Sequence, residues 1–195
     1  MTNERTIRSF LALDPPEEVL REIGRIEERL RKLIHGDIRW VRPESIHLTL
    51  KFFGDIPESD VANISAMAGK AAASVGTFEF ALGGAGVFPD MKRPRVVWLG
   101  MTGDVARFVA FQKELERALA EIGYPREERP FRPHLTLARI KSAQGLTGLA
   151  EAFKKVEPNT ERFTATGLNL FKSDLTSQGA IYTRLAEYPF GKRGM

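Results

Sequence analysis

The tetrapeptide His-Leu-Thr-Leu occurs twice in the chain, at residues 47–50 and again at residues 134–137. Side chains alternate between the two faces of a strand, so each copy places its histidine and threonine on one face and its leucines on the other. At ordinary residue frequencies a second copy has a chance on the order of one in a thousand. The repeat therefore predicts two related halves, each with one such strand, packed into a single body.

Strand and helix patterns recur in a similar order around both copies. Strands are expected near residues 7–13, 38–42, 46–53, 78–82, 95–99, 134–140, 162–171 and 180–187, and helices near 14–35, 59–75, 104–122 and 146–155. Helices that do not alternate strictly with strands favour an α+β fold with antiparallel sheets. Because no linker separates the halves, we expect residues 1–195 to form one domain made of two duplicated lobes.

A glycine-rich segment, residues 83–86, invites comparison with a phosphate-binding loop. No Gly-Lys-Ser/Thr follows it and no helical pattern starts there, so it predicts a bulge or bend within a strand instead.

Composition excludes several classes of protein. The chain has no cysteine, which rules out disulfides, thiolate zinc sites and cysteine nucleophiles. The apolar run near the N-terminus is too short for a secretion signal, and no stretch approaches the roughly 20 apolar residues of a membrane span. We therefore expect a cytoplasmic protein without membrane contact, and a monomer. The net charge of +4 suits a polyanionic partner and suits simple solubility equally well.

The two repeated histidines, His47 and His134, suit acid–base chemistry. Histidine titrates near neutral pH, so a neutral ring can take a proton from water while a charged partner gives one to a leaving oxygen. Thr49 and Thr136 supply hydroxyl donors for phosphate oxygens. By strict alternation Lys51 shares the face of His47, where it adds a positive charge if it lies deep enough and is otherwise a solvated surface lysine, while the leucines and Phe52 face the core.

Catalysis competes with simpler origins of the repeat. A polar residue on the wet face of a half-buried sheet needs no function, and duplication copies any strand. Zinc needs three or four N, S or O ligands, which this pattern does not offer, and a serine triad needs a nucleophile elbow that is absent from the sequence. We expect no metal and no cofactor.

The flanks of the two tetrapeptides resemble those of a known group of enzymes. The resemblance is carried by residues 8–12, 43–54, 88–89, 94–100 and 129–139, followed by Ser173, Gly179 and Tyr182. Together with the paired HxTx motifs they resemble the two-histidine (2H) phosphoesterase superfamily. Within it the chain is similar to the LigT-like RNA 2′,3′-cyclic phosphodiesterases, also called 2′-5′ RNA ligases, over nearly its whole length and in the same order.

This resemblance implies a fold and a reaction. The fold would have two pseudo-symmetric lobes with antiparallel sheets flanked by helices, and an active-site cleft between them. The reaction would convert a terminal 2′,3′-cyclic phosphate, on RNA ends or small nucleotides, to a 2′-phosphate. The resemblance makes His47 the proton donor and His134 the proton acceptor, with Thr49 and Thr136 binding the phosphate.

Four further residues are candidates for substrate binding: Lys51, Arg139, Tyr182 and Arg132. Arg139 falls on the leucine side by strict alternation, so it reaches the cleft only if the strand twists or ends there. Tyr182 has a ring that can stack on a base. Two other functions stay open: a nucleotide- or phosphate-binding module without turnover, and ligation of RNA ends by the reverse reaction.

Overall fold

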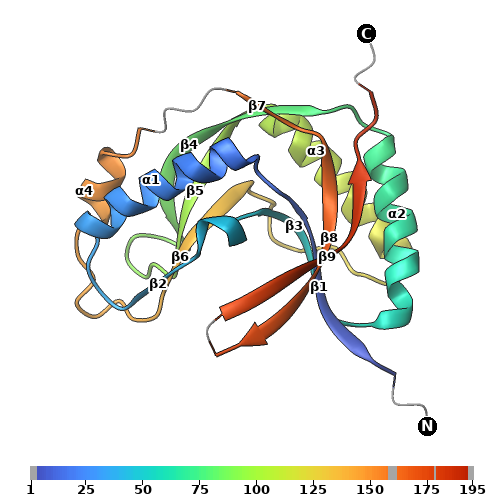
Figure 1. The fold of residues 1–195 in the computed structure, drawn as a ribbon, viewed down its shortest axis with the longest axis horizontal. Helices are drawn as coiled ribbons and strands as arrows, with labels where there is room; N and C mark the ends of the chain where they lie inside the picture. The colour runs from blue at the N-terminus through green and yellow to red at the C-terminus, as the bar shows by residue number, and fades with distance from the viewer. Residues whose placement is uncertain (1–3, 158–161, 178, 193–195) are drawn as a thin grey trace.

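The computed structural model describes residues 4–157, 162–177 and 179–192. Its elements, shown in Figure 1, are β1 (Thr6–Leu13), α1 (Glu17–Leu33), β2 (Ile38–Trp40), η1 (Pro43–Ser45), β3 (Leu48–Pro57), η2 (Glu58–Asp60), α2 (Val61–Ala73), β4 (Phe78–Phe88), β5 (Val96–Gly103), α3 (Val105–Glu121), β6 (His134–Ile140), α4 (Leu149–Lys154), β7 (Phe163–Ala165), β8 (Gly167–Thr176) and β9 (Gly179–Pro189). Most positions agree with the sequence patterns, but the single strand expected at 162–171 is wrong, because the chain forms two strands there, β7 and β8, which belong to different sheets.

The strands form two antiparallel sheets. One has the order β3-β1-β8-β9 and the other the order β2-β6-β5-β4-β7. The first tetrapeptide leads into β3 and the second opens β6, so the two copies belong to different sheets. The prediction of an α+β fold with antiparallel sheets is confirmed.

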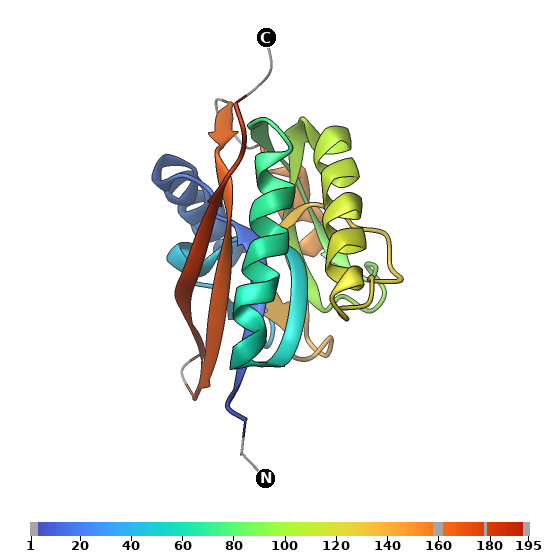
Figure 2. The same cartoon turned by 90° about the vertical axis from the view of Figure 1, so that its right-hand side faces the viewer.

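The helices pack into one core that joins the sheets. Phe108 of α3 meets Phe78 and Phe80 of β4 edge-on, with ring centroids 5.0 and 5.2 Å away. Figure 2 shows α2 between α3 and the strands β8 and β9. Tyr188 of β9 donates to the hydroxyl of Ser65 on α2 at 2.7 Å. The sheets are therefore held together by shared apolar packing rather than by a covalent link.

The glycine-rich segment lies inside β4. Its pairing with β5 shifts register between Leu82 and Ala85, which is a bulge at the predicted place.

Of the helices in the described part of the chain, none combines the length and the apolar character that a membrane span requires.

Candidate active site

A β-bulge follows each of the two histidines. In β3, Thr49 pairs with Ala12 and Lys51 pairs with Leu11, so Leu50 has no partner of its own. In β6, the pairing with β5 likewise skips Leu137. Both bulges lie three residues after the histidine. A bulge adds one residue to a strand, so the alternation of faces beyond it is reversed.

The bulge in β3 overturns the predicted place of Lys51. Its side chain is only 4% exposed and points into the interior, where it pairs with Glu116 at 2.8 Å and donates to the carbonyl of Pro125 at 2.6 Å. Phe52, expected in the core, is instead 43% exposed and lines the cavity beside Thr49. The expectations for both residues were wrong, because strict alternation ends at Leu50.

The bulge in β6 has the same effect on Arg139. Leu137 and Ala138 are both buried, and Arg139 beyond them is exposed and lines the cavity. The placement of Arg139 on the leucine side was therefore wrong. The bulge, rather than a twist or the end of the strand, brings its guanidinium to the open face of β6.

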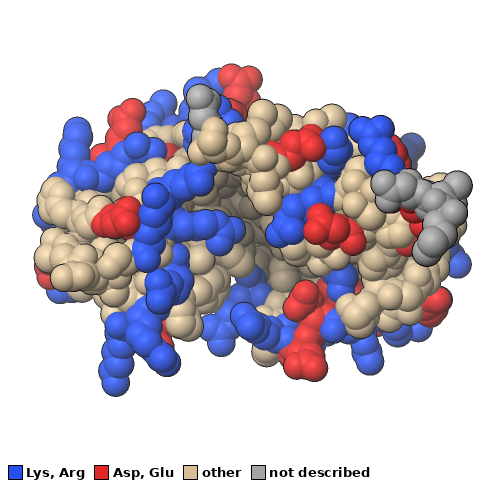
Figure 3. All heavy atoms as spheres, turned by 90° about the horizontal axis from the view of Figure 1, so that it is seen from below, with Lys and Arg blue, Asp and Glu red and all other residues tan. Residues whose placement is uncertain are grey.

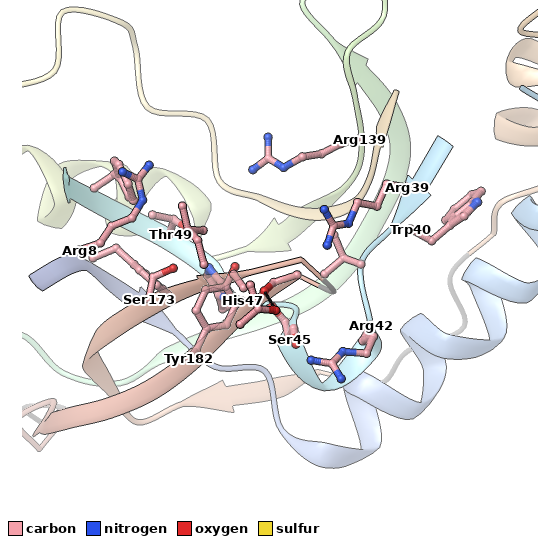
Figure 4. A pocket seen from close by; sticks show the side chains of 17 residues that line it. Arg8, Arg39, Trp40, Arg42, Ser45, His47, Thr49, Arg139, Ser173 and Tyr182 are labelled. Atoms are coloured by element: carbon pink, nitrogen blue, oxygen red, sulfur yellow. Dashed lines mark hydrogen bonds between the residues drawn. The ribbon is translucent and has the colours of Figure 1, made fainter. Parts of the chain in front are cut away.

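A cavity of about 560 Å³ lies between the two sheets. The first sheet contributes Arg8, Phe10, Thr49, Phe52, Ser173 and Tyr182, and the second contributes Arg39, Trp40 and Arg139; His47 and Arg42 line it from the segments before β3. Figure 4 shows the side chains of Arg8, His47, Thr49, Ser173, Tyr182, Arg39 and Arg139 around a common space. In Figure 3 lysines and arginines gather beside the hollow. Among the described residues, four arginines and no carboxylate line this cavity, so it favours an anion.

His47 lies in an aromatic recess of the first sheet. The ring of Phe10 stacks on it at 4.6 Å, and Tyr182 meets it edge-on at 5.1 Å. Nδ1 lies 3.0 Å from the carbonyl oxygen of Ser45. Burial lowers the pKa of His47 from 6.5 to about 4, because the recess disfavours the charged ring, and the positive charge of Arg139 lowers it further.

His134 repeats this arrangement on the second sheet. Its Nδ1 lies 2.6 Å from the carbonyl oxygen of Arg132, again two residues before the histidine. Burial lowers its pKa, and the charge of Arg139 adds to the effect. A carbonyl oxygen can only accept, so Nδ1 carries the hydrogen in both rings and the lone pair of each neutral ring is on Nε2.

The candidate residues do not all contact the same space. His47, Thr49, Arg139 and Tyr182 line the cavity, whereas the side chains of His134, Thr136 and Arg132 are not among its lining residues. His134 and Thr136 lie on the same face of β6 as Arg139, since the bulge follows them. Arg139 perturbs the pKa of both histidines, which links the two motifs electrostatically.

The sequence patterns did not point to every cavity residue. They missed four residues that line the cavity: Arg8, Arg39, Phe10 and Phe52. Arg8 and Phe10 alternate on one face of β1, and that spacing was a usable signal.

Across residues 4–157, 162–177 and 179–192, no three His, Asp or Glu side chains come together as a metal ion would require.

Comparisons with known proteins agree with this architecture. The model of the family "LigT like Phosphoesterase" matches residues 13–98 and 100–182. An RNA 2′,3′-cyclic phosphodiesterase of Methanothermobacter thermautotrophicus is 36% identical over 180 residues, or 91% of this chain and 95% of that protein. One of Aquifex aeolicus is 34% identical over 176 residues, or 88% and 93%.

Solved structures show the same fold. TT0787 of Thermus thermophilus superposes with a TM-score of 0.80 at 26% identity, covering 96% of this chain and 100% of that one. E. coli LigT complexed with 3′-AMP gives 0.76 at 25% identity, covering 95% and 99%. The match extends through both HxTx strands, which confirms the resemblance seen in the sequence. The chain belongs to the LigT-like phosphoesterase family of 2H phosphoesterases.

Proposed function

We propose that the protein is an RNA 2′,3′-cyclic phosphodiesterase that hydrolyses a terminal 2′,3′-cyclic phosphate to a 2′-phosphomonoester. The observation that carries the proposal is the matched pair of histidines, each held at Nδ1 by the carbonyl two residues before it. The names of the relatives at 36% and 34% identity support the same activity.

In the proposed reaction, water attacks the phosphorus atom and the bond from phosphorus to O3′ breaks. His134 Nε2 takes the proton from water and His47 Nε2 gives a proton to O3′, which leaves a 3′-hydroxyl and a 2′-phosphate. The hydroxyls of Thr49 and Thr136 donate to the non-bridging oxygens, where negative charge grows in the transition state. Arg139 adds a positive charge beside both histidines.

The donor role of His47 requires its pKa to rise when substrate binds. In the free protein its pKa of about 4 leaves the ring neutral at pH 7. A phosphate anion near Nε2 favours the charged ring and raises the pKa. Binding of substrate therefore causes His47 to take up the proton that it later donates. In the free protein the aromatic recess keeps the ring uncharged.

The proposal is tested with an oligonucleotide that ends in a 2′,3′-cyclic phosphate, followed by identification of the hydroxyl that keeps the phosphate. We expect a 2′-phosphate, at a rate that EDTA does not change. A 3′-phosphate product would contradict the assigned roles, and strong inhibition by EDTA would contradict metal independence. Binding without turnover would point to a non-catalytic module. Supplying a strand with a 5′-hydroxyl measures ligation by the reverse reaction.

A further inference from the structure

Two arginines face each other directly across a pair of strands. Arg39 of β2 and Arg139 of β6 are register partners in the antiparallel pairing of these strands. Partners in register share a face of the sheet, and like charges so placed repel each other. Within the described residues neither guanidinium forms an ion pair with a carboxylate. The fold therefore keeps a repulsive pair that the protein itself does not neutralise.

Both side chains lead into the active-site cavity. Figure 4 shows Arg39 and Arg139 extending from their strands towards the space beside His47. Arg139 perturbs the pKa of both histidines and is also the register partner of Arg39, so its charge acts both on the reacting phosphate and on the space beside Arg39. Arg39 contributes to neither of those effects and lies one strand further out, at the edge of the sheet. A cyclic phosphodiester carries one negative charge, which is fewer than these two cations can bind.

The opposite sheet closes over Arg39. Gly179, at the start of β9, has a φ of +139°, and a Cβ built on it would lie 2.8 Å from Nη2 of Arg39. A larger residue there would be strained and would displace the guanidinium. Arg39 is thus confined where the two sheets meet, and the space left to an anion is the cavity between it and Arg139.

We propose that Arg39 and Arg139 together bind a second phosphate group of the substrate, the internucleotide phosphate next to the terminal cyclic one. This inference rests on the proposed function. An anion between two guanidiniums forms charge-assisted hydrogen bonds with both and removes their repulsion. The preferred substrate is then an RNA strand of at least two nucleotides, rather than a mononucleoside cyclic phosphate.

The experiment compares three substrates with the same cyclic end: a mononucleoside 2′,3′-cyclic phosphate, a dinucleotide with an ordinary phosphodiester, and a dinucleotide with an uncharged methylphosphonate link. We expect wild-type kcat/KM to be highest for the ordinary dinucleotide. In Arg39→Gln, the kcat/KM of the ordinary dinucleotide relative to that of the mononucleotide falls about tenfold or more. The methylphosphonate dinucleotide loses the same preference over the mononucleotide in the wild type. Arg117→Gln, an equal loss of charge at an exposed position of α3 outside the cavity, leaves all three values unchanged.

The outcomes separate this inference from the proposed function. If Arg39→Gln lowers kcat/KM equally for all three substrates, Arg39 acts at the reacting phosphate and the second phosphate site is overturned. An Arg39→Gln variant that keeps the wild-type ratios of kcat/KM between the three substrates would also overturn the second phosphate site. Failure of the wild type on every substrate would reject the proposed function alone. In that case the affinity for a dinucleotide with a 2′-phosphate end still tests Arg39, because the variant should bind it about tenfold more weakly.

Discussion

The ammonium of Lys51 lies 2.8 Å from the carboxylate of Glu116, and both residues are only 4% exposed. The same oxygen of Glu116 accepts from the backbone N–H of Glu127 at 3.2 Å, and Lys51 donates to the carbonyl of Pro125. Gln112 donates to the carbonyl of Leu50, which lies in the bulge. This buried cluster ties the strand of the first motif to the loop that leads to the second.

We expect Lys51→Met to cost about 3–5 kcal/mol of unfolding free energy, because it leaves the Glu116 carboxylate buried without its partner. Adding Glu116→Leu should recover most of that loss, since apolar residues replace buried ion pairs well. Denaturant unfolding measures both. The double variant should keep a reduced kcat, because the contacts to Pro125 and Glu127 stay broken. Recovery of kcat along with stability would mean that the pair only stabilises the fold.

Replacement of either repeated histidine should abolish most turnover without unfolding the chain. We expect His47→Ala and His134→Ala each to lower kcat at least about a hundredfold, as the loss of a general acid or base does. His35→Ala is the matched control, since the third histidine pairs with Thr147 outside the cavity. Single-turnover rates and far-UV circular dichroism measure the two effects. Near-normal turnover by either catalytic variant would contradict the mechanism.

The hydroxyl of Thr49 should matter more than its shape. Thr49→Val keeps the volume and removes the donor, so we expect kcat to fall about tenfold, while Thr49→Ser keeps the donor and most of the activity. Steady-state kinetics on a cyclic-phosphate substrate distinguish the two. Equal activity of the valine and serine variants would show that the hydroxyl does not bind the phosphate.

His47 should titrate well below the ordinary range. Its folded pKa of about 4 lies below the unfolded value of 6.5, so its contribution to stability is complete above 6.5 and is lost as the pH falls towards 4. NMR of the imidazole nitrogens should show a neutral ring with hydrogen on Nδ1 at pH 6. Inorganic phosphate should raise the pKa. A free-protein pKa near 6.5 would show that the recess does not exclude water.

Glu27 of α1 should make stability depend on pH in the opposite direction. The residue is 2% exposed, and burial raises the pKa of its carboxyl from 4.5 to about 7. Because the folded value is the higher one, its stabilisation is complete below 4.5 and is lost as the pH rises through 7. Glu27→Gln should therefore raise the melting temperature more at pH 8 than at pH 5. Equal shifts at both values would contradict the raised pKa.

The alternation of apolar residues was enough to predict most strands and helices, and the fold class with them. It failed within the two motif strands because a bulge adds one residue and leaves no mark in the local pattern. Lys51 looked like a cleft residue for this reason. Its true partner, Glu116, lies 65 residues away on α3, and no spacing along the chain connects them.

The repeat pointed to His47 and Thr49, which line the cavity, and to His134 and Thr136, which are not among its lining residues, while the other cavity residues depend on packing between sheets. Arg39 reaches the cavity only because β2 pairs with β6 and the β8–β9 hairpin closes over it. Arg132 was a candidate for its charged side chain, whereas it is the backbone carbonyl of this residue that holds His134. Contacts made by backbone atoms, or across sheets, are invisible to residue-by-residue patterns.

The bulge in each motif strand brings the fifth residue after the histidine to the working face. In β3 that residue is Phe52 and in β6 it is Arg139, so the equivalent position holds an aromatic ring on one side of the cavity and a guanidinium on the other. The guanidinium of Arg8 lies 4.6 Å from the centre of the Phe52 ring, so this side of the cavity also carries a positive charge. The two motif strands therefore match in backbone geometry but not in side chains, and a ligand in the cavity meets a stacked arginine and phenylalanine on one side and the guanidinium of Arg139 on the other.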